Sequence, residues 1–479
     1  MPRMQHTSDA DLTSALYTDM YQLSMAHSHY NYNRHNEQVA FDYFYRKQPY
    51  NGGFTIFSGL GEVLALLQEF KFSSDDIDWL HRTTNFNDEF LEFLRDFRFK
   101  GTVYSMREGE VVFPQEPLVR VQGNLVEAQL VETALLNYLN FQSLIATKAA
   151  RIKQVARGAV LSEFGLRRAQ GVGGMLATRA AITGGFTSTS NVLGAKVYGV
   201  PAVGTIAHAY IQSYDDELTA FRDFAKVNPQ GCVLLVDTYD TLKIGVPNAI
   251  TVAKEMEQQG HKLMGIRLDS GDLAYLAKQA RQMLDAAGLS YVKIVVSNQL
   301  DEYIVKSLFD QGAPIDIFGV GTSLVTGKPD AALDGVYKLS MADGEPRLKL
   351  SENIKKTTLP GLKQVYRYHD DAGNFIADAV ALENEAAPEA IHHPYEPDKR
   401  MTLKGYSSQP LLQPVMKHGE LTITPTPILE VADYAAERLS KLTDEYKRFE
   451  NPHIYKVGLS KKLYDLRTEL RNKYKKDSL

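Results

Sequence analysis

From about Gly158 onward, short β-rich runs alternate with helix-length segments, and this alternation constrains the fold more than any other feature of the sequence. The β-rich runs are 159–163, 202–205, 232–237, 264–269, 293–298, 316–320 and 336–340. From residue 232 their spacing is roughly 20–30 residues, the length of a strand plus a crossover helix. Such a series predicts a parallel sheet, and the number of units favours a closed α/β barrel over an open sheet.

The alternation divides the chain into three expected parts. Residues 1–150 mix helix-like and strand-like segments, which predicts an N-terminal α+β domain. Residues 151–340 hold the barrel. Residues 341–479 are expected to form a C-terminal α+β region that packs on the N-terminal domain. The predicted fold class is therefore an irregular parallel α/β barrel with an α+β domain formed by the N-terminal and C-terminal parts.

Composition and charge exclude several classes of protein. The formal net charge of −5, from 53 Lys and Arg against 58 Asp and Glu, excludes a strongly basic nucleic-acid binder. The only cysteine, Cys232, excludes a disulfide framework and a cysteine-ligated zinc site. No apolar run approaches the roughly 18 residues of a membrane span, and the first residues, MPRMQHTSDADLTS, are polar and unlike a secretory signal. We therefore expect a soluble, cytoplasmic enzyme that binds neither nucleic acid nor membrane.

Charged and glycine-rich runs follow the predicted strands, where a parallel barrel carries its active site. Arg167, Arg168 and Arg267 are cations that can fork onto a phosphate or a carboxylate. The run GVGTS at 319–323 would let backbone N–H groups approach phosphate oxygens closely. The run DSGD at 269–272 could cap the helix that follows and place its N-terminus at the barrel mouth.

Two aspartates complete this set, because Asp237 and Asp269 could hold a divalent cation or sugar hydroxyls. Together the strand ends predict a site for a phosphate-bearing sugar with magnesium. Each motif alone is more often a tight turn, a helix cap or an ion pair, and a histidine such as His208 is more often structural. Their joint occurrence at successive strand ends is what favours a functional site.

Seven motifs in the sequence, taken in order, resemble the nicotinate phosphoribosyltransferase family of ATP-coupled type II phosphoribosyltransferases. They are LYTDMYQLSMA (16–26), SEFGLRRAQG (162–171), GGFTSTSNV (184–192), GVPAVGTIAHA (199–209), RLDSGDL (267–273), VVSNQLDEY (295–303) and FGVGTSLVT (318–326). No single motif is specific, but the ordered set is. Beyond about Tyr337 the resemblance assigns few features to this sequence.

The resemblance implies a reaction in NAD biosynthesis. Phosphoribosyl would pass from phosphoribosyl pyrophosphate to nicotinate, giving nicotinate mononucleotide and pyrophosphate. The resemblance also implies Mg²⁺, ATP as a co-substrate, coupling to ATP hydrolysis through a phosphohistidine, and a homodimer with shared active sites. It assigns no metal ligands.

The resemblance also assigns roles to individual residues. His208, in GTIAHA, matches the phosphorylated histidine and is expected to act together with Asp269 as a catalytic residue. The implied nicotinate-binding residues are Tyr21, supplied by the neighbouring subunit, Phe164, Thr205 and Arg267. The implied phosphoribosyl pyrophosphate-binding residues are Arg167, Ser297, Gly319, Gly321 and Thr322.

The expected substrate is nicotinate rather than nicotinamide. A carboxylate calls for cations and donors, whereas an amide NH₂ calls for an acceptor. Relatives that use the amide carry an aspartate in the turn that here reads Tyr198-Gly199-Val200. Because that turn holds no acid and Arg267 is present, the resemblance favours nicotinate.

Two alternatives stay open. The first is another barrel enzyme for sugar phosphates, such as an aldolase or isomerase, which would need a Schiff-base lysine or an acid–base pair at a strand end. Lys243 and Lys293 are the nearest lysines, and neither stands at the C-terminal end of a predicted strand. The second is a non-catalytic relative, and the presence of His208, Arg267 and Tyr21 argues against it.

Overall fold

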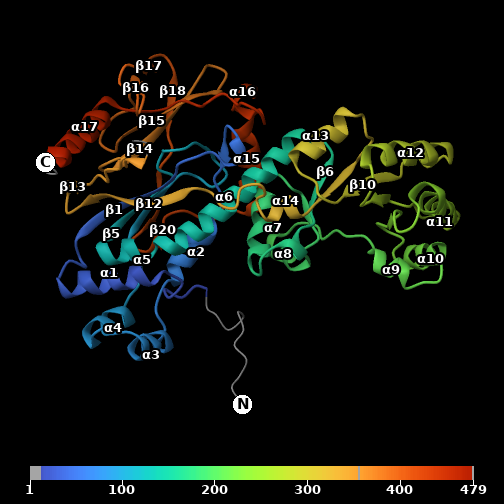
Figure 1. The fold of residues 1–479 in the computed structure, drawn as a ribbon, viewed down its shortest axis with the longest axis horizontal. Coiled ribbons are helices and arrows are strands. Elements are labelled where there is room, and N and C mark those ends of the chain that lie inside the picture. Colours follow the sequence, from blue (N-terminus) through green and yellow to red (C-terminus); the bar gives the residue numbers. More distant parts are fainter. Residues whose placement is uncertain (1–11, 354–355, 477–479) are drawn as a thin grey trace. The chain divides into compact units, whose positions relative to one another are not determined.

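The computed structural model describes residues 12–353 and 356–476, and the chain divides into two compact units. Unit 1 comprises Met1–Leu144 together with Ala332–Leu479, and unit 2 comprises Ile145–Ala331. Unit 2, drawn largely in green and yellow in Figure 1, is therefore inserted into the sequence of unit 1. Within the described ranges, no helix combines the length and the apolar character that crossing a bilayer requires.

Unit 2 is built on a parallel sheet of six strands in the order β7-β6-β11-β10-β9-β8. The strands are β6 (Val160–Glu163), β7 (Ser188–Thr189), β8 (Val233–Leu235), β9 (Gly265–Leu268), β10 (Lys293–Ser297) and β11 (Ile317–Val320). Every neighbouring pair is parallel. Most side chains of these strands are buried, as is usual for parallel sheets. The prediction of a parallel α/β sheet is confirmed.

The expected closed barrel is not confirmed, because β7 and β8 end the sheet and do not pair with each other. The predicted strand at 202–205 forms only an isolated bridge between Thr189 and Ala202. Pro201 has no N–H to donate and Gly204 has no side chain to pack, and both features weaken a strand. The segment that would extend the sheet beyond β7 is therefore irregular.

Helices connect the strands of unit 2. They are α7 (Gly173–Thr183), α8 (Val192–Tyr198), α9 (His208–Gln212), α10 (Glu217–Val227), α11 (Val246–Gln258), α12 (Leu273–Ala286), α13 (Glu302–Asp310) and α14 (Thr322–Val325), with short turns η3 (Leu166–Arg168) and η4 (Thr241–Gly245). Asp272 accepts the backbone N–H of Tyr275 at 3.0 Å, so the predicted cap in DSGD is confirmed.

A buried ion triad lies in unit 2, between α13 and the C-terminal half of α6 (Glu132–Val155). Glu302 receives Lys148 Nζ at 2.7 Å and Arg151 Nε at 2.8 Å, and all three side chains are at most 1% exposed. Burial alone would raise the pKa of the Glu302 carboxyl, but the two cations lower it below its usual value. The triad therefore fixes the start of α13, which follows β10.

Unit 1 contains a seven-stranded antiparallel sheet in the order β13-β12-β1-β5-β3-β19-β20. Its strands are β1 (Gln38–Tyr45), β3 (Thr102–Ser105), β5 (Val119–Asn124), β12 (Gly335–Ala342), β13 (Glu345–Pro346), β19 (Gln413–Lys417) and β20 (Glu420–Leu421). The run 336–340 was expected to continue the parallel series, and this prediction is wrong. It lies in β12, which pairs antiparallel with β1, more than half the chain away in sequence.

Unit 1 also contains a six-stranded sheet in the order β17-β16-β21-β15-β14-β18 and a two-stranded pair, β2-β4. The strands are β2 (Thr55–Ile56), β4 (Val111–Val112), β14 (Lys363–His369), β15 (Phe375–Leu382), β16 (Ala390–His392), β17 (Arg400–Thr402), β18 (Ser407–Pro410) and β21 (Val457–Leu459). The helices are α1 (Met20–Asn31), α2 (Leu60–Glu69), α3 (Ser74–Thr83), α4 (Asp88–Arg95), α5 (Leu125–Leu130), α15 (Ile428–Ser440), α16 (Asp444–Lys447) and α17 (Lys461–Lys476), with a short turn η2 (Pro49–Asn51).

Buried ion pairs join the two sequence segments of unit 1. Arg367, on β14, contacts Asp378 and Glu110 at 2.6 Å each, and all three side chains are at most 1% exposed. Lys363 Nζ lies 2.8 Å from Asp42 of β1, again with both side chains buried. The Arg367–Glu110 and Lys363–Asp42 pairs connect residues before position 145 with residues after position 331, so both segments are needed to satisfy the buried charges.

Candidate active site

A connected set of polar side chains lies at the C-terminal ends of β9 and β10. The guanidinium of Arg267 donates from Nε to Ser297 Oγ at 2.8 Å, from Nη1 to Thr205 Oγ1 at 2.9 Å and from Nη2 to Asp269 Oδ1 at 2.9 Å. Ser297 Oγ donates to the same Asp269 oxygen. Because parallel strands bring their carboxyl ends to one edge of the sheet, these residues meet although they are distant in sequence.

Asp237 extends this set at the end of β8. Its side chain is 1% exposed, and its Oδ2 accepts the backbone N–H of Asp269 at 2.8 Å and the hydroxyl of Ser270 at 2.6 Å. Its Oδ1 is buried and has no hydrogen-bond partner among the described residues. A buried carboxylate oxygen without a donor is costly, so it calls for a cation or a proton from a ligand.

His208 is the first residue of α9 and lies beside the two aspartates. Its Nδ1 is 3.1 Å from Thr238 Oγ1. Its Nε2 is 4.0 Å from Asp237 Oδ1 and 3.9 Å from Asp269 Oδ2, and the side chain is 40% exposed. When Nδ1–H donates to the Thr238 hydroxyl, Nε2 carries the free lone pair and is accessible to a ligand.

Phe164 links the β6 end to the glycine-rich run after β11. Its backbone N–H donates to Val320 O at 2.8 Å, and its ring centroid is 5.8 Å from Arg267 Cζ. A Cβ added at Gly319 would lie 2.4 Å from Phe164 Cδ2, and one at Gly321 would lie 3.1 Å from the Phe164 carbonyl oxygen. The packing of Phe164 is therefore a reason for these glycines that the sequence analysis missed.

A buried acid, Glu163, was also missed. It is 1% exposed and ends β6, directly before Phe164. It accepts hydrogen bonds from Thr178 Oγ1 at 3.0 Å, from Thr189 Oγ1 at 2.6 Å and from the backbone N–H of Gly165. Its position at a strand end next to an aromatic residue was the signal available in the sequence. These bonds fix the turn that presents Phe164.

Not every predicted residue joins the hydrogen-bonded set. Arg167 is exposed in η3, and Thr322 is exposed at the start of α14; neither contacts the Arg267 cluster. Tyr21 lies on α1 in unit 1, with 51% of its surface exposed. The structure thus gathers Thr205, His208, Arg267, Asp269 and Ser297 in unit 2, with Phe164 and the glycines packed beside them.

A metal site is not preformed from side chains alone. In the part of the chain that the structure describes, no group of three or more His, Cys, Asp or Glu residues is arranged to hold a metal ion. The unpartnered Asp237 Oδ1 is nevertheless the kind of ligand that Mg²⁺ accepts when substrate phosphates and water supply the rest.

Comparison with known proteins shows the family to which the chain is similar. Sequence models of the N-terminal domain, the family core and the C-terminal domain of nicotinate phosphoribosyltransferase match residues 16–140, 159–395 and 362–467. The nicotinate phosphoribosyltransferase of Bacillus subtilis is 42% identical over 460 residues, covering 94% of both chains.

Two solved structures are similar over most of the chain. The crystal structure of human nicotinic acid phosphoribosyltransferase has a TM-score of 0.84 at 30% identity and covers 95% of this chain and 99% of its own. The crystal structure of nicotinate-nucleotide pyrophosphorylase from Pyrococcus furiosus has a TM-score of 0.72 at 26% identity and covers 92% of this chain and 99% of its own.

Proposed function

This chain belongs to the nicotinate phosphoribosyltransferase family, and we propose that it transfers phosphoribosyl from phosphoribosyl pyrophosphate to nicotinate. The products are nicotinate mononucleotide and pyrophosphate, and the reaction serves NAD biosynthesis. The proposal rests on one observation: three side chains hold the guanidinium of Arg267 in place at the C-terminal ends of the parallel strands.

Arg267 is suited to recognising a carboxylate. A guanidinium has five N–H donors in a planar fork, and Thr205, Ser297 and Asp269 take three of those of Arg267. One N–H on each terminal nitrogen remains for a ligand, which matches the two oxygens of a carboxylate. The nearby Phe164 ring offers a flat apolar face for the pyridine.

Transfer at the anomeric carbon develops oxocarbenium character, so the protein contributes mainly positioning and charge stabilisation. We place the phosphates of phosphoribosyl pyrophosphate near Arg167, Ser297, Gly319, Gly321 and Thr322. Mg²⁺, which accompanies phosphoribosyl pyrophosphate and ATP, spreads the charge on their phosphates, and Asp237 with its unpartnered Oδ1 would hold it.

We further propose that ATP hydrolysis is coupled to transfer through His208. The Nε2 lone pair attacks the γ-phosphorus of ATP, the bond to the β–γ bridging oxygen breaks, and ADP leaves. The proton on Nδ1 stays on the hydrogen bond to Thr238 throughout. Water later cleaves the nitrogen–phosphorus bond and releases phosphate. The Thr238 hydroxyl orients the ring through Nδ1, and the carboxylates of Asp237 and Asp269 lie 4.0 Å and 3.9 Å from Nε2.

We also propose a cytoplasmic homodimer in which Tyr21 completes the site of the neighbouring subunit. The support is its half-exposed ring on α1, which is available for stacking on a flat ligand. Mixed dimers of Tyr21→Ala and His208→Ala chains should regain ATP-coupled activity, because one site of each pair then has both residues. Mixtures shown to have exchanged subunits but to have gained no activity would count against sharing.

The transfer reaction is tested with purified protein, labelled nicotinate, phosphoribosyl pyrophosphate and Mg²⁺, with and without ATP. Labelled nicotinate mononucleotide is expected, with faster formation in the presence of ATP. A parallel reaction with nicotinamide should be much slower. No labelled nucleotide in any arm would favour a different sugar-phosphate enzyme.

The coupling step has a separate test. ATP labelled in its γ-phosphate should leave an acid-labile, base-stable label on the protein, and His208→Ala should lose both the label and the ATPase activity while keeping slow transfer. Thr238→Ala is the companion variant, and it should keep a weaker label because the ring loses only its Nδ1 partner. If His208→Ala still couples ATP hydrolysis to product formation, the coupling residue lies elsewhere.

A further inference from the structure

A pocket of about 570 Å³ lies within unit 1, and none of its lining residues belongs to the candidate active site. The lining comes from α2, from residues 105–110, and from the C-terminal segment between Gln409 and Tyr434. One wall is apolar and buried, and consists of Leu60, Leu64, Leu411 and Val415. The volume falls in the usual range for small-molecule sites, about 300–1,000 Å³.

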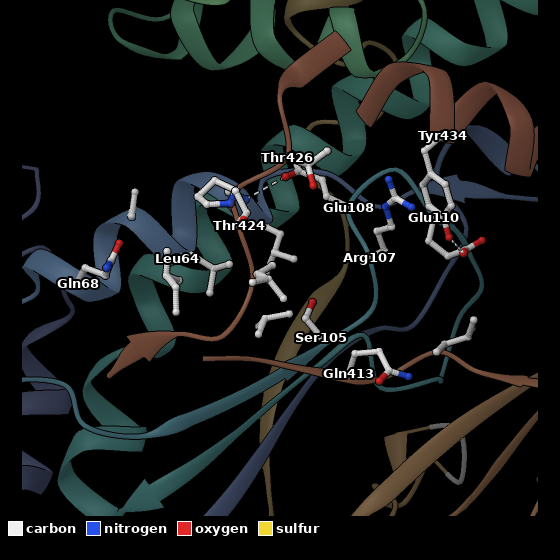
Figure 2. A pocket seen from close by; sticks show the side chains of 18 of the residues that line it. Leu64, Gln68, Ser105, Arg107, Glu108, Glu110, Gln413, Thr424, Thr426 and Tyr434 are labelled. Atoms are coloured by element: carbon white, nitrogen blue, oxygen red, sulfur yellow. Dashed lines mark hydrogen bonds between the residues drawn. The ribbon is translucent and has the colours of Figure 1, made fainter. Parts of the chain in front are cut away.

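The charged residues of this pocket gather at one end. Figure 2 shows Arg107, Glu108, Glu110 and Tyr434 close together there, with Gln68 toward the opposite end. The pocket is therefore amphipathic, with an apolar wall and a charged end. Which charge is available to a ligand depends on what the two carboxylates already bind.

Glu108 is committed to the N-terminus of α2. Its Oε1 accepts the backbone N–H of Gly59 at 2.6 Å, and its Oε2 accepts that of Gly61 at 2.9 Å. The positive end of the helix dipole offsets its charge. With both oxygens engaged by backbone donors, Glu108 has little capacity left to bind a cationic ligand.

Glu110 is also committed, to buried cations beneath the pocket. Its Oε1 accepts from Arg367 Nη1 at 2.6 Å and from Arg438 Nε at 2.9 Å, and its Oε2 accepts the Tyr434 hydroxyl at 2.6 Å. Glu110 itself is 1% exposed. Its negative charge is thus paired inside the protein and is not presented to the pocket.

Arg107 is the charged group of this end that remains available. It is exposed, and its Cζ lies 4.0 Å from the centroid of the Tyr434 ring. It makes no ion pair with any residue in the described ranges 12–353 and 356–476. The stacked ring steadies the guanidinium while leaving its N–H groups free to donate to an anion.

We propose that this pocket binds a small organic anion whose apolar body packs on the leucine and valine wall and whose anionic group pairs with Arg107. The apolar wall favours a ligand with an apolar body, and the single available charge, on Arg107, favours a ligand with a negative charge. A cationic ligand is disfavoured because both carboxylates are already saturated. The site is independent of the transfer reaction proposed above.

The proposal is tested with two dyes that share one ring system. The probe is 8-anilinonaphthalene-1-sulfonate, an aromatic anion, and the comparison is uncharged N-phenyl-1-naphthylamine, both titrated into the full chain by fluorescence. Arg107→Gln should weaken binding of the anion about tenfold, the size of one partly exposed charge pair, and should leave binding of the neutral dye unchanged. Arg82→Gln, another exposed arginine on α3 outside the pocket, should change neither.

A second variant tests the location. Ala65 is exposed on α2 and lines the pocket, so Ala65→Trp should fill it and abolish saturable binding of both dyes without disturbing the core. Arg267→Ala, in unit 2, should bind both dyes as the wild type does. The proposal is overturned if Arg107→Gln binds the anion as tightly as the wild type, if Ala65→Trp retains binding, or if Arg267→Ala loses it. Far-UV circular dichroism and melting curves verify that each variant is folded.

Discussion

Replacing Arg267 by alanine distinguishes two roles of this residue, namely pairing with the carboxylate of the substrate and supporting the neighbouring side chains of the site. The Arg267 side chain is only 15% exposed and its guanidinium donates to three side chains, so its charge is held in place before any substrate arrives. Losing one partner of such a desolvated pair costs about 2–5 kcal/mol. This corresponds to a fall of about 30- to 5,000-fold in kcat/KM for nicotinate in Arg267→Ala.

The same change should affect nicotinamide much less, because an amide carries no charge to pair. Initial rates with both substrates give the ratio of their kcat/KM values, and that ratio should fall by nearly the same factor as the nicotinate value. Arg267→Lys keeps the charge but not the planar fork, so an intermediate loss is expected.

A matched control removes one of the partners instead of the charge. Thr205→Val eliminates the hydroxyl that accepts from Nη1 and keeps the guanidinium. It should lower kcat/KM by about 10- to 150-fold, since a single hydrogen bond to a charged group is worth about 1.5–3 kcal/mol. An equal loss for both substrates in Arg267→Ala would refute carboxylate recognition and would leave Arg267 as a support for its neighbours.

Two further predictions concern packing in unit 2. Glu302→Gln should lower the free energy of unfolding by about 3–5 kcal/mol, because the two buried cations lose their shared carboxylate; urea unfolding followed by far-UV circular dichroism measures this. The pKa of Glu302 is lower in the folded protein than in the unfolded chain. Its contribution to the free energy of unfolding is therefore fully present above the unfolded pKa of about 4.3 and is lost as the pH falls through the folded pKa. The stabilities of the wild type and the variant should thus converge in acid. Gly319→Ala places a Cβ 2.4 Å from Phe164. It should lower the free energy of unfolding by about 1–3 kcal/mol and raise the KM for nicotinate. Gly204→Ala, where nothing lies within 4 Å, is its control, and equal effects of the two changes would contradict the packing argument.

The local sequence pattern was sufficient to predict the parallel sheet and much of the candidate site. The runs that became β9, β10 and β11 are short, buried and regularly spaced, so their ends could be located to within a residue or two. Because parallel strands end at one edge, the meeting of Arg267, Asp269 and Ser297 could be expected from the predicted strand ends. Thr205 joins them although 202–205 forms no strand.

Sheet membership and long-range partners could not be predicted in this way. Residues 336–340 have the composition of the preceding strands, but their partner is β1, and nothing local distinguishes the two sheets. The commitment of Glu110 to Arg367 and Arg438 joins residues more than half the chain apart. Spacing also could not reveal that Gly319 accommodates the ring of Phe164, because that contact depends on the pairing of β6 with β11.

The insertion of unit 2 between the two segments of unit 1 has a consequence for the order of events on the ribosome. All residues of unit 2 have been synthesised by Ala331, before β12 and β14 exist, so the parallel sheet can form while the antiparallel sheet still lacks its last strands. Until those strands emerge, the edge of β1 and the buried carboxylates Asp42 and Glu110 have no partners from the C-terminal segment. Unit 1 is therefore the part of the nascent chain that keeps an unpaired strand edge and unpaired carboxylates longest, and it closes only when translation is nearly complete.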